Sequence, residues 1–251
     1  MNTMIHPEAV IGENVAFGYH CVVEAGARIG NGVLIGHNVI IYEGSSIGDG
    51  CVIHDNVVIG KKPMRAARSI LKPQADYPPT IIGSRCTIGT NAVIYKDAKL
   101  EDEVFVADLA TIREKVTVGQ QTIVGRNVAI ENECSIGAYC KIETNAYITA
   151  FSVVEDYAFV APGVVTSNDN FIGRTEQRFQ AFKGCTIKRG GRVGANATLL
   201  PGTVIEEEGV VGAGSVVTKR VPEEQIVVGN PARPLRQVDP EQLLKNDPTK
   251  K

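Results

Sequence analysis

Large apolar residues recur at every sixth position along most of the chain. The series runs from Ile5 to Ile59, resumes from Ile82 to Val160, and resumes again from Ile187 to Val217, which makes thirty repeats. A small or β-branched residue stands four positions after each of them, as Ala9 follows Ile5, so every hexad offers two inward side chains at strand-like spacing. Units this short cannot bury an apolar face alone. They must stack on one another, which predicts a parallel β-helix.

The turn positions of the repeat support this prediction. Half of the residues three positions after the large apolar residue are Gly or Asn, the residue types that best tolerate a positive φ angle. Early examples are Asn14, Gly26, Gly32, Asn38 and Gly44. The corners of the predicted coils are therefore encoded in the sequence.

Two insertions interrupt the repeat, at residues 65–81 and 166–186. We expect one β-helix domain over residues 1–238, from which both insertions leave as loops, followed by a polar tail over residues 239–251. Loops that leave a rigid solenoid often carry function. The first loop opens with a group of cations that we call the basic cluster: Lys61, Lys62, Arg65 and Arg68. Lysine and arginine in such a cluster predict phosphate binding, and a solvated loop is the alternative.

Composition narrows the class of protein. With 43% hydrophobic residues, 251 residues suffice for a substantial core. The net charge of −2 and the absence of tryptophan give no nucleic-acid signature. The N-terminus lacks a signal-peptide pattern and no long apolar run occurs, so we expect a cytoplasmic protein that does not enter a membrane. Five cysteines occupy the small inward position of the repeat and are expected to be buried core residues; we call them the lattice cysteines: Cys21, Cys51, Cys86, Cys134 and Cys140. Cys185 lies off the repeat, and one leftover thiol favours a reducing compartment.

The repeat Ile-Gly-x-x-Val-x, as in Ile11–Ala16, resembles that of the hexapeptide-repeat acyltransferases. This resemblance implies an all-β fold, a left-handed parallel β-helix of about ten coils with eighteen residues per coil. It also implies a homotrimer. The segment Val221–Arg233 is similar to the one with which many of these enzymes close the prism and bind coenzyme A. By that likeness the residues predicted to bind acetyl-CoA are Gly212, Ala213, Gly214, Ser215, Lys219, Asn230, Pro231 and Arg233.

The positions of the histidines bear on the chemistry. Acyl transfer to a hydroxyl usually needs a positioned base, most often histidine. All four histidines lie before the first insertion, at His6, His20, His37 and His54. An amine is already a good nucleophile near neutral pH, and the departing thiolate can take up its proton. The sequence therefore favours N-acylation over O-acylation.

The run from Ile142 to Asp169 resembles the nucleotide-linked aminosugar N-acetyltransferases of bacterial surface-polysaccharide pathways. The likeness implies that Asn145 holds the sugar amine through its side-chain carbonyl, so that the amine attacks the thioester directly, and that the sugar is linked to dTDP or UDP. Glu143 and Asp169 are the further catalytic candidates. The polar second loop predicts three substrate-binding residues: Asn168, Asn170 and Arg174. The chain departs from the family by reading Thr-Ser-Asn-Asp at 166–169.

Three other functions remain open at this point. A hexapeptide O-acyltransferase, or a relative of UDP-N-acetylglucosamine acyltransferases, is suggested by the opening Ile5–Ala9. A γ-type carbonic anhydrase is suggested by His20, His37 and His54, which fall seventeen residues apart. Their neighbours lack the expected ligand spacing, and we expect no metal. A non-catalytic scaffold is the third alternative, and the coenzyme-like segment argues against it.

Overall fold

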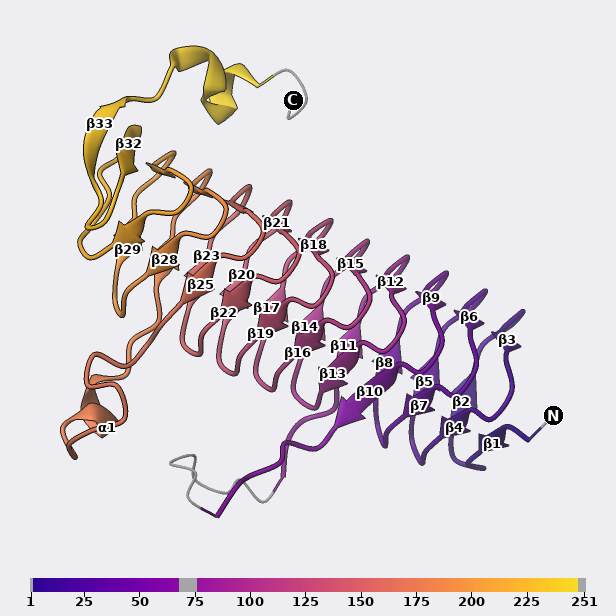
Figure 1. Ribbon diagram of the computed structural model, residues 1–251. Helices are drawn as coiled ribbons and strands as arrows, with labels where there is room; N and C mark the ends of the chain where they lie inside the picture. Colours follow the sequence, from indigo (N-terminus) through magenta and orange to yellow (C-terminus); the bar gives the residue numbers. More distant parts are fainter. Residues whose placement is uncertain (1, 68–75, 248–251) are drawn as a thin grey trace. The chain divides into compact units, whose positions relative to one another are not determined.

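The computed structural model describes residues 2–67 and 76–247, and in Figure 1 short strands stack on one another within each part of the chain. The chain divides into two compact units, Met1–Asn127 and Val128–Lys251, which are described separately. The single short α-helix of the described residues is α1 (Arg178–Ala181). The predicted all-β parallel β-helix is confirmed in each unit.

In the first unit, the strands form three parallel stacks that each take every third strand. The first stack contains β1 (Met4–Ile5), β4 (Val22–Val23), β7 (Ile40–Ile41), β10 (Val58–Lys61), β13 (Val93–Tyr95) and β16 (Thr111–Ile112). The second contains β2 (Val10–Ile11), β5 (Arg28–Ile29), β8 (Ser46–Ile47), β11 (Ile81–Ile82), β14 (Lys99–Leu100) and β17 (Thr117–Val118). The third contains β3 (Ala16–Phe17), β6 (Leu34–Ile35), β9 (Val52–Ile53), β12 (Thr87–Ile88), β15 (Phe105–Val106) and β18 (Ile123–Val124).

The second unit repeats the arrangement. One stack contains β19 (Ala129–Ile130), β22 (Tyr147–Ile148), β25 (Val165–Thr166), β28 (Thr198–Leu199) and β31 (Val216–Val217). Another contains β20 (Ser135–Ile136), β23 (Val153–Val154), β26 (Thr186–Ile187) and β29 (Val204–Ile205). The last contains β21 (Lys141–Ile142), β24 (Phe159–Val160), β27 (Arg192–Val193), β30 (Val210–Val211), β32 (Gln225–Val228) and β33 (Arg233–Gln237). Only β33 runs antiparallel to its neighbour, β32, among the pairings described.

The core is built from the large apolar residue of each hexad. Ile35 pairs in register with Ile53, eighteen residues later, and both side chains point inward. Most of these residues are fully buried, including Ile41, Ile59 and Ile94. Each contributes about 1.5–3 kcal/mol through burial, so the repeated column is the main stabilising feature.

The glycine of the Ile-Gly motif has a steric cause. At Gly30, a Cβ atom would strike the carboxylate and backbone of Asp49 in the next coil. The Asp49 carboxylate uses that space to accept a hydrogen bond of 2.6 Å from the N–H of Asn31. The same arrangement recurs in the next hexad, where Gly36 faces Asp55 and the Asp55 carboxylate accepts the N–H of His37. The motif therefore leaves room for a side chain that bridges neighbouring coils.

The predicted corners adopt the expected backbone. Asn14, Asn38 and Asn56 have φ angles of 57°, 56° and 59°. The Asn38 side-chain amide donates to the Asn56 side-chain carbonyl at 3.1 Å, so asparagines on one corner also link successive coils. Asparagine therefore serves this corner of the first unit both as a turn residue and as a link between coils.

The cysteines are all free and buried, which confirms the prediction for the five lattice cysteines. Cys185, off the repeat, is also buried, at 1% exposure. Its thiol donates to the Ser152 hydroxyl at 3.6 Å. Burial raises the pKa of Cys134 to about 12 and that of Cys185 to about 11.

The strands extend slightly into the predicted loops. Ile81 and Thr186 lie in β11 and β26 as the outward residues next to the buried Ile82 and Ile187. Thr166 lies in β25 as the buried, inward residue next to the exposed Val165. The tail forms two short 3₁₀ helices, η1 (Pro240–Gln242) and η2 (Leu244–Asn246). It is less polar in its contacts than expected, since Leu243 packs with Ile226 and Val238. None of the described helices is long and apolar enough to cross a membrane.

Candidate functional site

One corner of the second unit joins two groups of predicted site residues. Backbone hydrogen bonds of 2.8–3.0 Å run from Gly163 N–H to Thr144, from Asn196 N–H to Pro162, and from Gly214 N–H to Ala195. Four turns therefore stack in the order Asn145, Gly163, Asn196 and Gly214. Three coil spacings separate the first from the last, which is about 14 Å. The predicted amine-binding asparagine and the predicted coenzyme turn thus occupy one edge.

Asn145 lies at the tip of its turn. Its backbone has a φ of 62° and its side chain is exposed. Glu143, two residues earlier, is half-buried, and its backbone is fixed by the hydrogen bond from Glu143 N–H to Val160 at 2.8 Å. Both side chains belong to one rigid turn, so this corner offers an amide next to a carboxylate.

An apolar surface leads from this corner to the second loop. Tyr147 in β22 and Val165 in β25 pair in register and are 37% and 45% exposed. The next residue, Thr166, is buried, and its hydroxyl accepts the N–H of Thr149 at 2.7 Å and donates to Tyr147 at 3.0 Å. Thr166 therefore anchors the point at which the chain leaves the coil.

The second loop is held together by Asp169. Its carboxylate accepts the N–H groups of Phe171 and Gly173, each at 2.9 Å, and pairs with the Arg178 guanidinium at 2.7 Å. Desolvation would raise the pKa of Asp169, but the hydrogen bonds from Gly173, Arg178 and Phe171 outweigh it and lower the pKa. A carboxylate engaged in this way is a poor proton acceptor, so the arrangement favours a role for Asp169 in shaping the loop.

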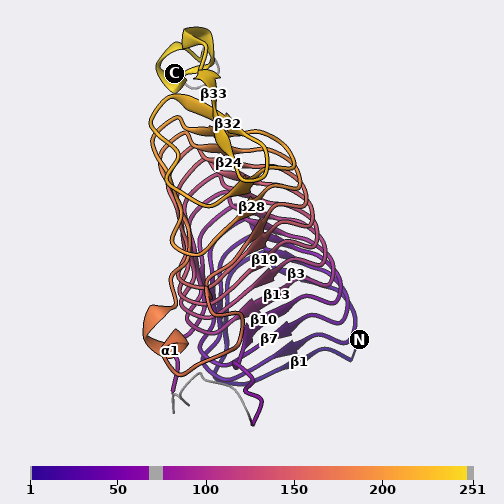
Figure 2. The same cartoon turned by 60° about the vertical axis from the view of Figure 1, so that its left-hand side comes forward.

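Arg178 was not identified by the sequence analysis. It begins α1 and lies over the rings of Phe179 and Phe182, with 5.4 Å and 5.2 Å to the centroids. Figures 1 and 2 both show α1 standing away from the stacked coils of its unit. An arginine nine residues after an aspartate, beside two phenylalanines, is the signal that could have indicated the contact.

The other predicted loop residues are placed differently. Asn168 is half-buried. Its backbone carbonyl closes the loop by accepting a hydrogen bond from the backbone N–H of Lys183 at 3.1 Å. Asn170 and Arg174 are exposed. Their side chains are therefore available to a ligand at the outer part of the loop.

The predicted coenzyme turn is only partly open. Gly214 has a φ of 68° and no atom within 4 Å of the place where a Cβ would stand. The N–H groups of Gly212, Gly214 and Ser215 all donate to backbone carbonyls. The Ser215 side chain is buried, and its hydroxyl accepts the N–H of Gly229 at 3.0 Å. A pantetheine arm would therefore meet the carbonyls of this turn or Ala213, which is exposed.

The coenzyme-like segment closes the second unit. The Asn230–Pro231 peptide bond is cis, and Ala232 N–H donates to Val216 at 2.8 Å. The side chains of Asn230, Pro231, Arg233 and Lys219 are exposed. The segment thus caps the stack and presents polar groups to solvent.

The basic cluster belongs to the first unit. Lys61 ends β10, and its Nζ lies 5.9 Å from the Tyr95 ring centroid. Lys62 pairs with Glu43 at 3.2 Å, and Arg65 is exposed. Arg68 lies outside the described residues.

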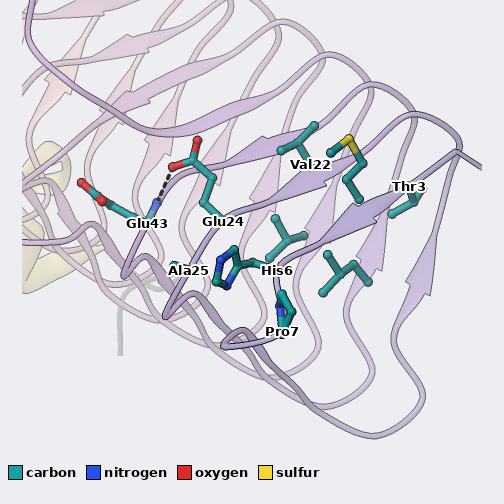
Figure 3. Close-up of a pocket in the computed structure, with 10 residues that line it drawn as sticks. Thr3, His6, Pro7, Val22, Glu24, Ala25 and Glu43 are labelled. Carbon is teal, nitrogen blue, oxygen red and sulfur yellow. Dashed lines mark hydrogen bonds between the residues drawn. The ribbon is translucent and has the colours of Figure 1, made fainter.

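The first unit also contains a hollow of about 690 Å³ near its first coils. Its lining includes Met4. Figure 3 shows four further lining residues coming from successive coils: His6, Val22, Glu24 and Glu43. It contains none of the predicted catalytic residues.

The histidines and acidic side chains give no metal-binding group in residues 2–67 and 76–247. His37 instead stacks on Tyr19, with 5.3 Å between ring centroids. Its Nδ1 accepts the N–H of Tyr19 at 2.8 Å.

Comparison with known families confirms the resemblance to the hexapeptide-repeat acyltransferases. The bacterial transferase hexapeptide model (six repeats) matches residues 26–61. The model for the hexapeptide repeat of succinyl-transferase matches residues 8–43, 79–107 and 189–219. These stretches of the chain are therefore similar to the hexapeptide repeats of such transferases.

Individual relatives are similar over short stretches. A dTDP-3-amino-3,6-dideoxy-alpha-D-galactopyranose 3-N-acetyltransferase of Aneurinibacillus thermoaerophilus is 43% identical over 54 residues, or 22% of this chain and 28% of the relative. A putative acetyltransferase of Staphylococcus aureus is 48% identical over 48 residues, or 19% of this chain and 24% of the relative. The chain thus spans about a quarter of the length of these curated relatives.

Among solved structures, the Arabidopsis UDP-N-acetylglucosamine acyltransferase is similar over 98% of this chain and 75% of its own, with a TM-score of 0.57 and 16% identity. At this identity the likeness shows the fold.

Proposed function

We propose that the protein is an acyl-CoA-dependent N-acyltransferase that moves an acetyl group to the amine of a nucleotide-linked amino-deoxysugar. The observation that carries the proposal is the shared corner of the second unit. There, Asn145 and the coenzyme-like turn at Gly214 lie on one edge, about 14 Å apart. The extended pantetheine arm of coenzyme A is long enough to reach along such an edge.

The proposed chemistry needs no histidine. The Asn145 side-chain carbonyl accepts a hydrogen bond from the sugar amine and aims the nitrogen lone pair at the thioester carbon. The new C–N bond forms as the C–S bond breaks. The proton of the amine nitrogen ends on the departing sulfur, which leaves as the free thiol of coenzyme A. Correct positioning supplies most of the catalysis in this scheme.

Other residues are assigned by their surroundings. Glu143, in the same turn as Asn145, is the candidate for binding a sugar hydroxyl or accepting a proton. Asp169 shapes the second loop through Arg178 and through two backbone N–H groups. Asn168, Asn170 and Arg174 are proposed to contact the substrate from that loop. The basic cluster is proposed to bind phosphate groups.

Similarity to a dTDP-aminosugar N-acetyltransferase supports the choice of an amine as acceptor. The opening Ile5–Ala9 keeps O-acylation as the second candidate. In the first unit, His37 is committed to Tyr19 through its Nδ1, which weighs against that residue as a free base.

The proposal is tested by incubating the purified protein with acetyl-CoA and a panel of dTDP- and UDP-linked 3-amino and 4-amino sugars. Release of free thiol and a product heavier by one acetyl group are the expected results. Matched nucleotide sugars with a hydroxyl in place of the amine serve as controls. Equal transfer to the hydroxyl sugars would replace the N-acyltransferase proposal with O-acylation.

A further inference from the structure

Lys96 in the first unit is a buried cation at the place where the first loop leaves the coils. Its side chain is 5% exposed, and its Nζ pairs with the Glu43 carboxylate at 2.7 Å. Burying a lysine is costly unless it is paired, so this contact requires an explanation.

The order of the strands in their stack explains how Glu43 and Lys96 come together. Glu43 follows β7, Lys61 ends β10, and Lys96 follows β13, and these three strands are successive members of one stack. The intermediate coil is the one that the first loop interrupts. The Lys96–Glu43 pair therefore links two coils past the one that the first loop interrupts, beside the backbone hydrogen bond from Lys96 N–H to Lys61 at 3.0 Å.

The Glu43 oxygen that pairs with Lys96 also pairs with a second lysine. Glu43 Oε1 pairs with Lys62 of the basic cluster at 3.2 Å, and Lys62 is 68% exposed. Hydrogen bonds from Lys96 and then Lys62 lower the pKa of Glu43, so the carboxylate is charged at neutral pH. The Glu43 backbone N–H is held by Glu24 at 3.1 Å, and Figure 3 shows its carboxylate directed away from Glu24.

Two further cations in this part of the first unit contact Tyr95. The Arg113 guanidinium lies 5.0 Å from the Tyr95 ring centroid and pairs with the buried Glu114 at 2.8 Å. Lys61 lies over the same Tyr95 ring. Among the described residues, Glu43 is thus the carboxylate that pairs with both Lys62 and Lys96.

We propose that Lys96 is a positioning residue that neutralises Glu43 and so releases Lys62 to bind a phosphate group at the mouth of the first loop. When Lys62 turns to a phosphate oxygen, Glu43 keeps Lys96 and is never left unpaired. Without Lys96, Glu43 would compete with the phosphate for Lys62. The ligand chemistry is that of a nucleoside diphosphate, and this choice rests on the proposed function.

The test measures binding of dTDP and UDP by calorimetry at low salt, without any acyl donor. The variants are Lys96→Met, Glu43→Gln and the double variant, each also followed by thermal unfolding. The exposed Arg85–Glu103 pair of the same unit, 2.8 Å long, gives a matched control as Arg85→Met with Glu103→Gln.

The expected order of nucleotide affinities and melting temperatures distinguishes a positioning role of Lys96 from a role in stability alone. Lys96→Met should weaken nucleotide binding by roughly tenfold, the scale of one charge-assisted contact. The double variant should recover to within about threefold of the wild type, because the phosphate no longer competes with the Glu43 carboxylate for Lys62. Glu43→Gln should bind at least as well as the wild type but melt at the lowest temperature, because it leaves Lys96 buried without a carboxylate.

The inference is overturned if Lys96→Met binds as the wild type does, if the double variant binds no better than Lys96→Met, or if the wild type binds neither nucleotide. These results differ from a failure of the proposed function. If the nucleotides bind with the expected order of affinities but no aminosugar is acetylated, the proposed function fails and the role of Lys96 stands.

Discussion

Replacing Asn145 gives the most direct test of the proposed mechanism, provided that backbone effects are removed. Asn145 has a φ of 62°, and an alanine at such an angle would add strain of about 1–2 kcal/mol. Glycine adopts this angle without that cost. Asn145→Gly therefore removes the side-chain carbonyl while keeping the turn.

The structure sets the expected magnitudes. The Asn145 side chain is exposed, so its removal should change the free energy of unfolding by less than about 1 kcal/mol. If it holds the amine, turnover should fall by roughly one to three orders of magnitude, which is about 1.4–4 kcal/mol of activation free energy. The two effects are therefore separable in a single variant.

The assay is steady-state release of free thiol with the aminosugar identified by the panel, combined with thermal unfolding. Asn38→Gly is the matched control, because Asn38 has nearly the same φ, 56°, and occupies a corner of the first unit. It should keep full turnover. The rate of the wild type should rise with pH as the substrate amine deprotonates, and then level off.

The mechanism of direct attack would be refuted by full turnover in Asn145→Gly together with loss of turnover in His37→Ala or His54→Ala. That combination would assign the reaction to a histidine base, as in the O-acyltransferase alternative. Partial loss in Asn145→Gly with a matching loss in Asn38→Gly would also refute it, because corner structure alone would then explain the effect.

Three further predictions concern the core, the loop and the assembly. Single Cys→Ala changes at the lattice cysteines should cost about 1 kcal/mol each and leave activity intact; rapid labelling of several of these thiols in the folded protein would contradict their burial. Reversing the charges of Lys61 and Lys62 together should raise a Michaelis constant more than it lowers turnover, and unchanged kinetics would assign the basic cluster to solubility. Light scattering at micromolar concentration should give the mass of a homotrimer, and a monomeric mass in an active sample would disprove the assembly.

The fold could be predicted because its cause is local and repeated. Each hexad carries its own inward residue, its own small residue and its own turn, so thirty weak signals agree. The column formed by Ile35 and Ile53 follows from the six-residue spacing together with the eighteen-residue coil that the family resemblance implies. Even the cysteines could be assigned to the core, because they replace Ala or Val at a fixed position of the repeat.

Contacts across the loops could not be predicted in the same way. Lys96 stands at a turn position where a lysine in the sequence looks like a solvated charge. Its burial comes with a contact to Glu43, 53 residues earlier, on the far side of the coil that the first loop interrupts. No periodic signal encodes a contact that exists because the repeat is interrupted.

The coenzyme turn shows a related limit. The motif at Gly212–Ser215 was expected to offer backbone groups to a ligand, but Gly212 N–H is taken by Val227 of the additional strand β32. The Ser215 hydroxyl is taken by Gly229 of the same segment. Because this segment lies beyond the last repeat, the register that brings it onto the turn could not be read from the hexads.

The second loop shows why residue type alone does not assign a role. Asp169 was a candidate base because it is a carboxylate in a polar loop near Asn145. In the structure, two backbone N–H groups and the Arg178 guanidinium occupy that carboxylate, and the resulting low pKa opposes proton uptake near neutral pH. A reaction in which the amine proton leaves on sulfur has no need of such a base. The engagement of Asp169 in the loop therefore agrees with the proposed mechanism, in which the protein contributes position rather than proton transfer.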